Sequence, residues 1–262
     1  MNMAVKVLVS QLRNVARNRW IIGYAVLLFA VTELLLRFGG GGERALLSLL
    51  NVVLLLLPLV SVVFGVIYVH NSREFIELLL AQPVGRGALY GGLFGGLVLT
   101  LTSGFVLGVG VPLLLQGGGS PGYLSQGALL VLAGVLLTVV FTAFGLAVAV
   151  RFDDRVRALG AALGVWLLCA LVYDGIILLV TTLFADYPLE APLLVMTFLN
   201  PVDLARVALL LSFDISALMG YTGAVYERFF GAGGLALALA MLLVCAAVPF
   251  GAGWRWFKRK DF

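Results

Sequence analysis

The sequence predicts an all-α integral membrane protein with six transmembrane helices, an N-terminal amphipathic interfacial helix, and short outer helices between spans five and six. Two observations lead to this fold class. Of 262 residues, 62% are hydrophobic and only 11% are charged, against roughly 25% charged residues in a soluble domain. The apolar residues also gather in runs of about 20, the length at which a helix crosses the hydrocarbon core.

Six runs reach or approach that length. The first is expected to be a permanent span, because Glu33 and Arg37 end it and no small-residue cleavage site follows. The longest stretch outside the runs is about 45 residues, short of the ~50 that a domain needs, so residues 1–262 form one transmembrane domain. The predicted spans are 20–36, 45–69, 88–115, 124–150, 158–184 and 232–252.

The positions of lysine and arginine predict the orientation, because cytoplasmic loops of membrane proteins carry the excess of these residues. Thirteen of the seventeen lie near the two termini, the loop between spans two and three, or the loop between spans four and five; four lie on the other side. Both termini are therefore expected in the cytoplasm, in a bacterial inner membrane. The positive charge then matches anionic membrane lipids, and no nucleic-acid partner is expected, because no basic face is interleaved with aromatic residues.

Residues 1–19 are expected to form an amphipathic helix on the inner membrane surface. Val5, Leu8, Leu12 and Val15 recur at helical spacing, while Lys6 and other basic residues occupy the remaining faces. Two roles stay open for this helix, a basic anchor and a contact with a partner.

Residues 186–231 form the predicted outer segment. Its apolar stretches, 193–199 and 204–211, are too short to span. Asn200, Pro201 and Asp203 together predict a helix start, because asparagine caps, proline suits the first turn, and an acidic side chain favours the positive end of the helix dipole. The segment either plugs the outer end of the bundle or holds a partner.

Glycines at small-xxx-small spacing allow helix backbones to approach closely within the membrane. They occur at 91–96 and as the pair Gly104 and Gly108. Packing inside one subunit is the favoured interpretation, and a dimer face is the alternative.

The chain lacks the residues that nucleotide or metal chemistry needs. Its only lysines, Lys6, Lys258 and Lys260, follow no glycine-rich loop, so no Walker-type phosphate site is expected. The single histidine, His70, is interpreted as an interfacial polar residue, and Cys169 and Cys245 as small hydrophobes. No directly bound cofactor, metal site or catalytic residue is predicted.

Two acidic residues lie inside the predicted spans. Glu33 precedes Arg37 by four residues, so the two can pair on one helix face. Asp174 has no basic residue in its own span, and a lone carboxylate at depth should face the bundle interior, find a partner or be protonated. Asp174 is the candidate pathway residue, with a tolerated position in the outer half as the alternative.

Residues 71–87, NSREFIELLLAQPVGRG, interrupt the apolar pattern with a short polar-flanked helix. Asn71 and Glu74 predict a capping box, and Glu77 adds negative charge near the helix start. Apolar side chains supply a ridge, and a proline with nearby glycines should end the helix. The predicted product is a firm cytoplasmic knob that receives force from outside the membrane; its ridge residues are Phe75, Leu78, Leu79 and Leu80, and its stop residues are Pro83, Gly85 and Gly87.

The run from Glu77 to Arg86, ELLLAQPVGR, resembles the coupling-helix motif of type-2 ABC exporter permeases. The surface helix, the six spans and the outer segment match the same family plan. Within the family, the segments RNRW at 17–20, PVGRG at 83–87, DRVRA at 154–158 and LNPVDL at 199–204 resemble the permeases that serve nitrous oxide reductase maturation. The chain departs from the family at Glu74 and Phe75, where Gly-Thr is frequent.

The resemblance implies partners and contact residues. A separate ABC ATPase subunit would hydrolyse the ATP, a second permease copy would complete a homodimer, and a periplasmic partner would bind the outer segment, in support of a copper–sulfur site. The implied ATPase-coupling residues are Glu74, Phe75, Glu77, Leu78, Leu79, Pro83 and Arg86, with Asp154 and Arg155 in a second, smaller contact; the implied outer partner contacts are Asn200, Pro201, Asp203 and Arg206.

Three alternatives remain at this point: a general exporter permease for lipid or drug-like substrates, a non-transporting membrane scaffold, and a channel or secondary carrier. A carrier predicts charged or broken helices at the midplane, where the sequence offers only Asp174. A scaffold does not need a cytoplasmic knob.

Overall fold

The computed structural model describes residues 19–40, 42–82, 85–116, 121–184, 187, 189–213 and 220–260. Within these ranges every regular element is a helix, which confirms the predicted fold class. The surface helix expected at 1–19 lies outside the described residues except for Arg19, the first residue of α2.

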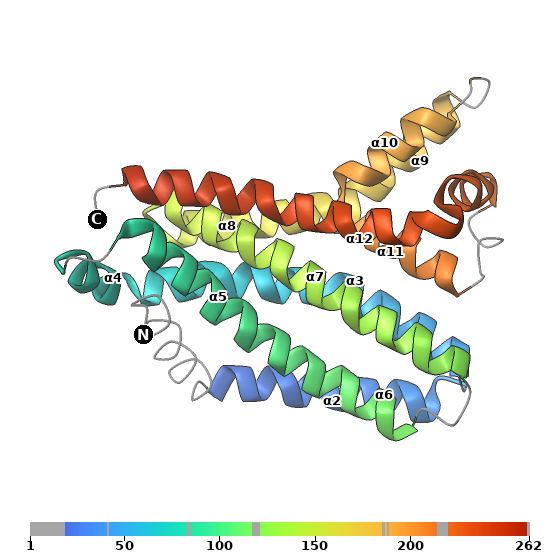
Figure 1. The fold of residues 1–262 in the computed structure, drawn as a ribbon, viewed down its shortest axis with the longest axis horizontal. Coiled ribbons are helices and arrows are strands. Elements are labelled where there is room, and N and C mark those ends of the chain that lie inside the picture. Colours follow the sequence, from blue (N-terminus) through green and yellow to red (C-terminus); the bar gives the residue numbers. More distant parts are fainter. Residues whose placement is uncertain are drawn as a thin grey trace.

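Six helical segments are long and apolar enough to cross a membrane, and they match the six predicted runs with ends that differ by a few residues, except that the last continues to Arg259 instead of ending at residue 252. Figure 1 shows them as a bundle of roughly aligned helices. The third and fifth spans each contain a five-residue π-helix. The helices that contain the spans are α2 (Arg19–Phe38), α3 (Gly42–Asn71), α5–η1–α6 (Arg86–Phe105, Val106–Gly110, Val111–Gln116), α7 (Pro121–Arg151), α8–η2–α9 (Arg155–Leu167, Leu168–Val172, Tyr173–Leu183) and α12 (Gly220–Arg259), of which Gly234–Arg259 is the sixth span.

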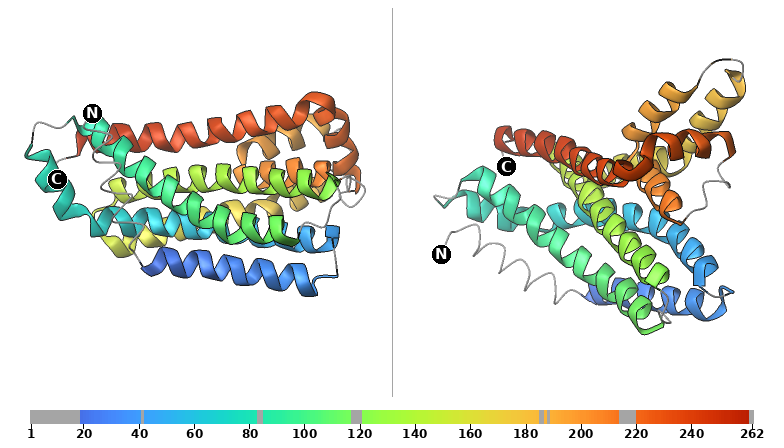
Figure 2. Two further views of the ribbon diagram at one scale, coloured as in Figure 1. Left: turned by 60° about the horizontal axis from the view of Figure 1, so that its bottom comes forward. Right: turned by 45° about the vertical axis from the view of Figure 1, so that its right-hand side comes forward.

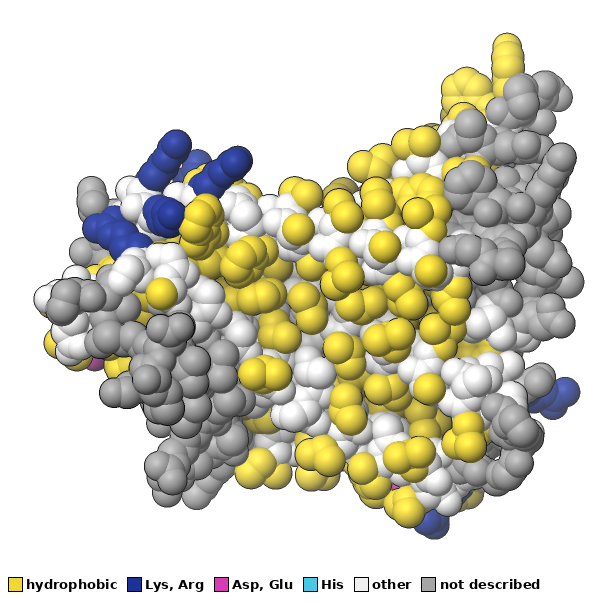
Figure 3. All heavy atoms as spheres, in the orientation of Figure 1, with side chains coloured by type: hydrophobic (Ala, Val, Ile, Leu, Met, Phe, Trp, Pro, Cys, Tyr) yellow, Lys and Arg dark blue, Asp and Glu magenta, His cyan; other side chains and the backbone are white. Residues whose placement is uncertain are grey.

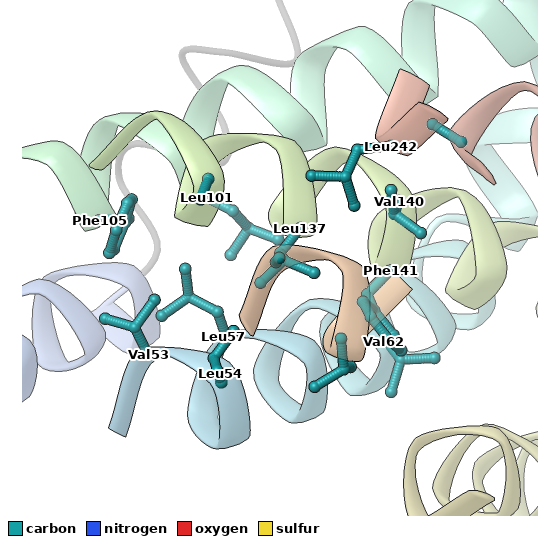
Figure 4. Packing of buried hydrophobic residues seen from close by; sticks show 14 of the residues in the cluster. Val53, Leu54, Leu57, Val62, Leu101, Phe105, Leu137, Val140, Phe141 and Leu242 are labelled. Carbon is teal, nitrogen blue, oxygen red and sulfur yellow. The ribbon is translucent and has the colours of Figure 1, made fainter. Parts of the chain in front are cut away.

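The core lies where α7 packs against α3, α5 and α12. Gly65 of α3 and Gly145 of α7 bring the two backbones together, since a Cβ built on Gly145 would lie 2.6 Å from the Val62 carbonyl oxygen. Such contact needs glycine, because any side chain would separate the helices. Around this crossing the buried side chains point into a common interior (Figure 4), among them Val53, Leu57, Leu101, Phe105, Leu137, Phe141 and Leu242.

Span five lies at the edge of the bundle. Only 11% of its most apolar window is buried, and Leu168, Leu171 and Leu178 are 51–66% exposed. In Figures 1 and 2 the second half of this span, α9, leans away from the other helices together with α10 (Glu190–Leu199). Large apolar side chains on the outside are expected of a protein whose surroundings are lipid.

The glycine pair in span three packs inside the subunit. A Cβ on Gly108 would lie 2.7 Å from Leu28 Cβ of α2, and one on Gly104 would lie 3.3 Å from the Tyr24 ring. These glycines therefore let α2 pack closely against η1 and the end of α5, in agreement with the favoured interpretation that they serve packing inside one subunit.

Between spans five and six, α10 and α11 (Pro201–Ser212) meet at a sharp bend of 112°. Asn200 lies in this bend and caps α11, with its Oδ1 accepting from the Val202 N–H at 3.1 Å. The predicted helix start is thus confirmed. α12 begins at Gly220, so the last part of the predicted segment 186–231 belongs to the sixth span's helix.

The bend lies level with the middle of spans five and six. Asn200 Nδ2 donates to the carbonyl of Cys169 at 2.8 Å. Cys169 lies near the midpoint of span five, Arg155–Leu183. The Cys245 thiol, near the midpoint of Gly234–Arg259, lies 3.8 Å from the carbonyl oxygen of Phe198. Counted as one span, the bent pair would be a seventh crossing.

Basic side chains gather at one end of the bundle, here called the basic end, where the ends of α7 and α12 and the starts of α5 and α8 meet. Figure 3 shows them at the left, beside a broad hydrophobic surface. The described members are Arg73, Arg86, Arg151, Arg155, Arg157, Arg255, Lys258, Arg259 and Lys260.

Candidate functional site

α4 (Arg73–Leu80) is a two-turn helix between α3 and α5 at the basic end (Figure 1). Its N-cap residue is Ser72, which makes no side-chain capping bond. The predicted capping box was therefore wrong: Asn71 is the last residue of α3, and its Oδ1 accepts from Arg155 Nη1 at 3.4 Å. The preceding span continues farther than expected and takes Asn71 into its own last turn.

The apolar side chains of α4 divide between two faces. Ile76 is fully buried, and Leu79 and Leu80 pack half-buried against the core. Phe75 and Leu78 face outward and are 38% and 68% exposed. The spacing 76, 79, 80 is the helical signal that identifies the buried face, and sequence analysis missed Ile76 as the anchor. α4 is thus fixed on one side and offers an apolar pair on the other.

The charged residues of α4 are largely exposed. Arg73 Nε lies 3.1 Å from Glu77 Oε1, four residues along the helix, and both side chains are nearly half exposed. Glu74 is exposed. α4 ends at Leu80, three residues before the predicted stop at Pro83, which lies outside the described residues.

Arg86, at the start of α5, contacts the end of span six. Its Nη1 donates to the carbonyls of Lys258 and Lys260 at 2.9 and 3.1 Å. The last carbonyls of a helix have no partner within it, so the guanidinium satisfies them and complements the negative end of the helix dipole. Arg86, predicted as an ATPase contact, thereby joins span three to span six.

A second bridge reaches the same helix end from the loop between α7 and α8. Lys260 Nζ lies 2.7 Å from Asp153 Oδ1 and donates to the Val150 carbonyl at 2.8 Å. The Lys260 ammonium, by hydrogen bond and charge, lowers the pKa of the exposed Asp153 carboxyl. We call Arg86, Asp153 and Lys260, together with the carbonyls to which Arg86 and Lys260 donate, the C-terminal clamp.

The predicted second contact lies beside the clamp. Asp154 caps α8, because its Oδ1 accepts from the Val156 N–H at 3.0 Å. Arg155 reaches Asn71 at the end of α3, close to the start of α4. The structure therefore brings Asp154 and Arg155 to the same end of the bundle as α4, although about 80 residues separate them in sequence.

A polar cluster forms at the bend between α10 and α11. Arg206 Nη1 lies 2.7 Å from Asp174 Oδ2 of α9 and 3.2 Å from Asp203 Oδ1, while Asn200 Nδ2 donates to Asp203 Oδ2 at 2.9 Å. Of the three outcomes expected for Asp174, the structure shows a partner, and this cation comes from a helix outside span five, 32 residues later in the chain. The cluster fastens span five to α11.

The predicted outer partner residues are mostly turned inward. Asn200 and Asp203 are 1% and 4% exposed, and Pro201 is buried at the start of α11. These three side chains hold the bend together, whereas Arg206 is partly exposed.

Two further predicted features can be placed. Glu33 pairs with Arg37 at 2.8 Å, as expected, and also accepts from Gln116 of α6. In the described part of the chain, no three His, Cys, Asp or Glu side chains come together as a metal site would need.

Comparison with known proteins agrees with this arrangement. Residues 43–262 match the family described as ABC-2 family transporter protein. The chain belongs to this ABC-2 family. It is also similar to two curated relatives, each named "Probable ABC transporter permease protein NosY". The one from Stutzerimonas stutzeri is 28% identical over 232 residues, covering 82% of this chain and 83% of the relative. The one from Pseudomonas aeruginosa is 28% identical over 249 residues, covering 88% and 90%.

An ABC-2 permease is the transmembrane subunit of a transporter. The chain is therefore a multi-pass membrane permease subunit, resembling NosY. Membership of the ABC-2 family implies an ABC ATPase on another chain and, typically, a dimer of permeases.

Proposed function

We propose that this ABC-2 permease couples ATP hydrolysis by a separate ATPase subunit to the export or presentation of a substrate, as a homodimer in a bacterial inner membrane. The basic end then faces the cytoplasm with both termini. One observation carries the proposal: α4 projects at the basic end, anchored by the fully buried Ile76 and exposing Phe75 and Leu78. An exposed apolar pair on a fixed helix suits docking into a partner's groove.

The contacts of α4 provide a route for force into the membrane. Ile76, Leu79 and Leu80 pack against the core, so a displacement of α4 acts on the ends of α3 and α5. The C-terminal clamp then joins the start of α5 to the end of α12, and Asp153 joins α12 to the loop before α8. Spans three, four, five and six are thus tied together beside the docking helix, and Asp154 and Arg155 supply the smaller second contact.

For the cargo, we propose a role in assembling the copper–sulfur site of nitrous oxide reductase, with a periplasmic partner at the end of the bundle opposite the basic end. The similarity to NosY permeases along most of the chain supports this choice. The alternatives are export of lipid or drug-like substrates and a scaffold that transports nothing.

Co-purification tests the coupling proposal. Leu78→Asp places a charge on the exposed face of α4 without touching the buried Ile76, so the permease should still insert while the ATPase no longer co-purifies. Phe38→Asp is the matched control, because Phe38 is also exposed, at 81%, but ends α2 at the opposite end of the bundle. Retention of a stoichiometric ATPase by Leu78→Asp would overturn the assignment of α4.

A further inference from the structure

An apolar groove opens between span three and the start of α7, at the end of the bundle opposite the basic end. Its volume is about 270 Å³. One wall is formed by η1 and α6, and the other by the first three turns of α7. The lining residues are Val106, Gly110, Leu113, Leu114, Tyr123, Leu124, Gly127, Ala128 and Val131.

The π-helix and two glycines shape this groove. A π turn is wider than an α turn. Here Gly108 of the π-helix packs against Leu28 of α2 on one side, while Val106 and Gly110 line the groove. There Gly110 and Gly127 present no side chain. A Cβ on Gly127 would lie 3.7 Å from Leu113, and one on Gly110 would lie 3.6 Å from Val106, so a side chain at either position would meet a groove-lining residue at ordinary van der Waals distance.

The groove is open to the surroundings of the protein. Leu114 is 73% exposed, Leu124 is 45% exposed and Val106 is 38% exposed. The neighbouring Leu107 and Leu115 are also exposed, at 59% and 73%. These residues belong to spans three and four, so the surrounding medium is the bilayer.

Water does not suit this groove. Tyr123 carries the only polar side-chain atom among the nine lining residues, whereas an ordered water needs two to four polar partners. Apolar cavities of ~150 Å³ stay dry and take up small hydrocarbons. The side chains that line an empty space lack the van der Waals contacts that a bound molecule would supply. The groove is larger than such a cavity, and the hydrocarbon of the bilayer lies next to it.

We propose that the groove is a binding site for one acyl chain of a membrane phospholipid. Tyr123 fixes the orientation of the lipid. It lies two residues after the start of α7 at Pro121, where a tyrosine ring suits the boundary between hydrocarbon and headgroups. The phenol then faces the ester end of the lipid, and the chain runs past Gly127 toward Val131. The site takes its ligand from the leaflet opposite the basic end.

Photo-crosslinking of the purified full-length permease in nanodiscs tests this assignment. The probe is a phosphatidylethanolamine with a diazirine in one acyl chain, and the labelled peptides are mapped by mass spectrometry. Labelling should concentrate on 106–114 and 123–131. Gly127→Leu fills the groove and should reduce that labelling to the level of other lipid-facing helices, whereas Gly23→Leu, on an exposed face of α2 with nothing within 4 Å, should leave it unchanged.

Three outcomes would overturn the proposal. The first is equal labelling of the groove and of exposed residues such as Leu178. The second is unchanged labelling in a folded Gly127→Leu protein. The third is a cross-link between two permease copies at the groove, which would show that a second copy occupies it. Should Gly127→Leu fail to insert, Gly110→Leu fills the same groove from the opposite wall and decides the matter by the same comparison.

Discussion

Replacing Arg206 with alanine should destabilise the permease more than any other single removal of a charge at the polar cluster. Arg206 is the cation for both Asp174 and Asp203. Its loss leaves Asp203, whose side chain is 6% exposed, without a positive partner among the residues that the structure describes. Breaking a buried pair on one side costs up to about 3–5 kcal/mol, because the remaining carboxyl stays buried and must either keep its charge or take up a proton.

The same geometry predicts a much smaller effect for Asp174→Asn. The Asp174 side chain is 41% exposed at the edge of the cluster, so replacing its carboxylate with an amide leaves no fully buried charge without a partner. Arg206 also keeps Asp203 when Asp174 is lost. Asp174→Asn should therefore insert, fold and bind the ATPase normally, and any loss of cellular output would report on the transport cycle rather than on folding.

Thermal unfolding of the purified permease measures the difference. For a chain of this size 1 kcal/mol corresponds to roughly 2–4 °C, so Arg206→Ala should lower the midpoint on the order of 10 °C. Arg73→Ala is the control, because it removes an i,i+4 pair in which both side chains are 44–46% exposed and should shift the midpoint by about 1 °C. Equal shifts for Arg206→Ala and Arg73→Ala would refute the reasoning that the cluster is a buried, shared-cation network.

Two further predictions concern coupling and orientation. Arg86→Lys keeps the charge but loses the guanidinium that donates to the carbonyls of Lys258 and Lys260. ATPase co-purification should therefore persist, while ATP hydrolysis no longer yields cellular output. An unchanged ratio of cellular output to ATP hydrolysis would show that the C-terminal clamp does not transmit force. The second prediction uses Tyr187→Cys in a background where Cys169 and Cys245 are alanine. The new thiol should react with a membrane-impermeant reagent in intact spheroplasts, because Tyr187 is 67% exposed in the predicted outer segment. Labelling only after the membrane is opened would reverse the orientation.

Much of the fold follows from local sequence, and the reason is physical. In hydrocarbon each span must satisfy its backbone hydrogen bonds within its own helix, so length and hydropathy alone place the six spans. Local rules also predicted the cap at Asn200 and the pair of Glu33 with Arg37, since both contacts span at most four residues. The same rules failed at Asn71, where tertiary continuation of α3 overrode a plausible cap.

Only the tertiary structure decided which helices meet. Lipid tails are as apolar as leucine, so the hydrophobic pattern of a span does not distinguish the face that packs on protein from the face that meets lipid. For this reason the sequence indicated neither the crossing of Gly65 with Gly145 nor the groove beside η1. The partners of Asp174 and Arg86 stand 32 and 172 or more residues away, and a contact over such a separation exists only once the helices are packed. The sequence by itself determined which six runs are long and apolar enough to cross the membrane and where the charges lie along the chain. The packing determined which charges meet and which apolar face is left open.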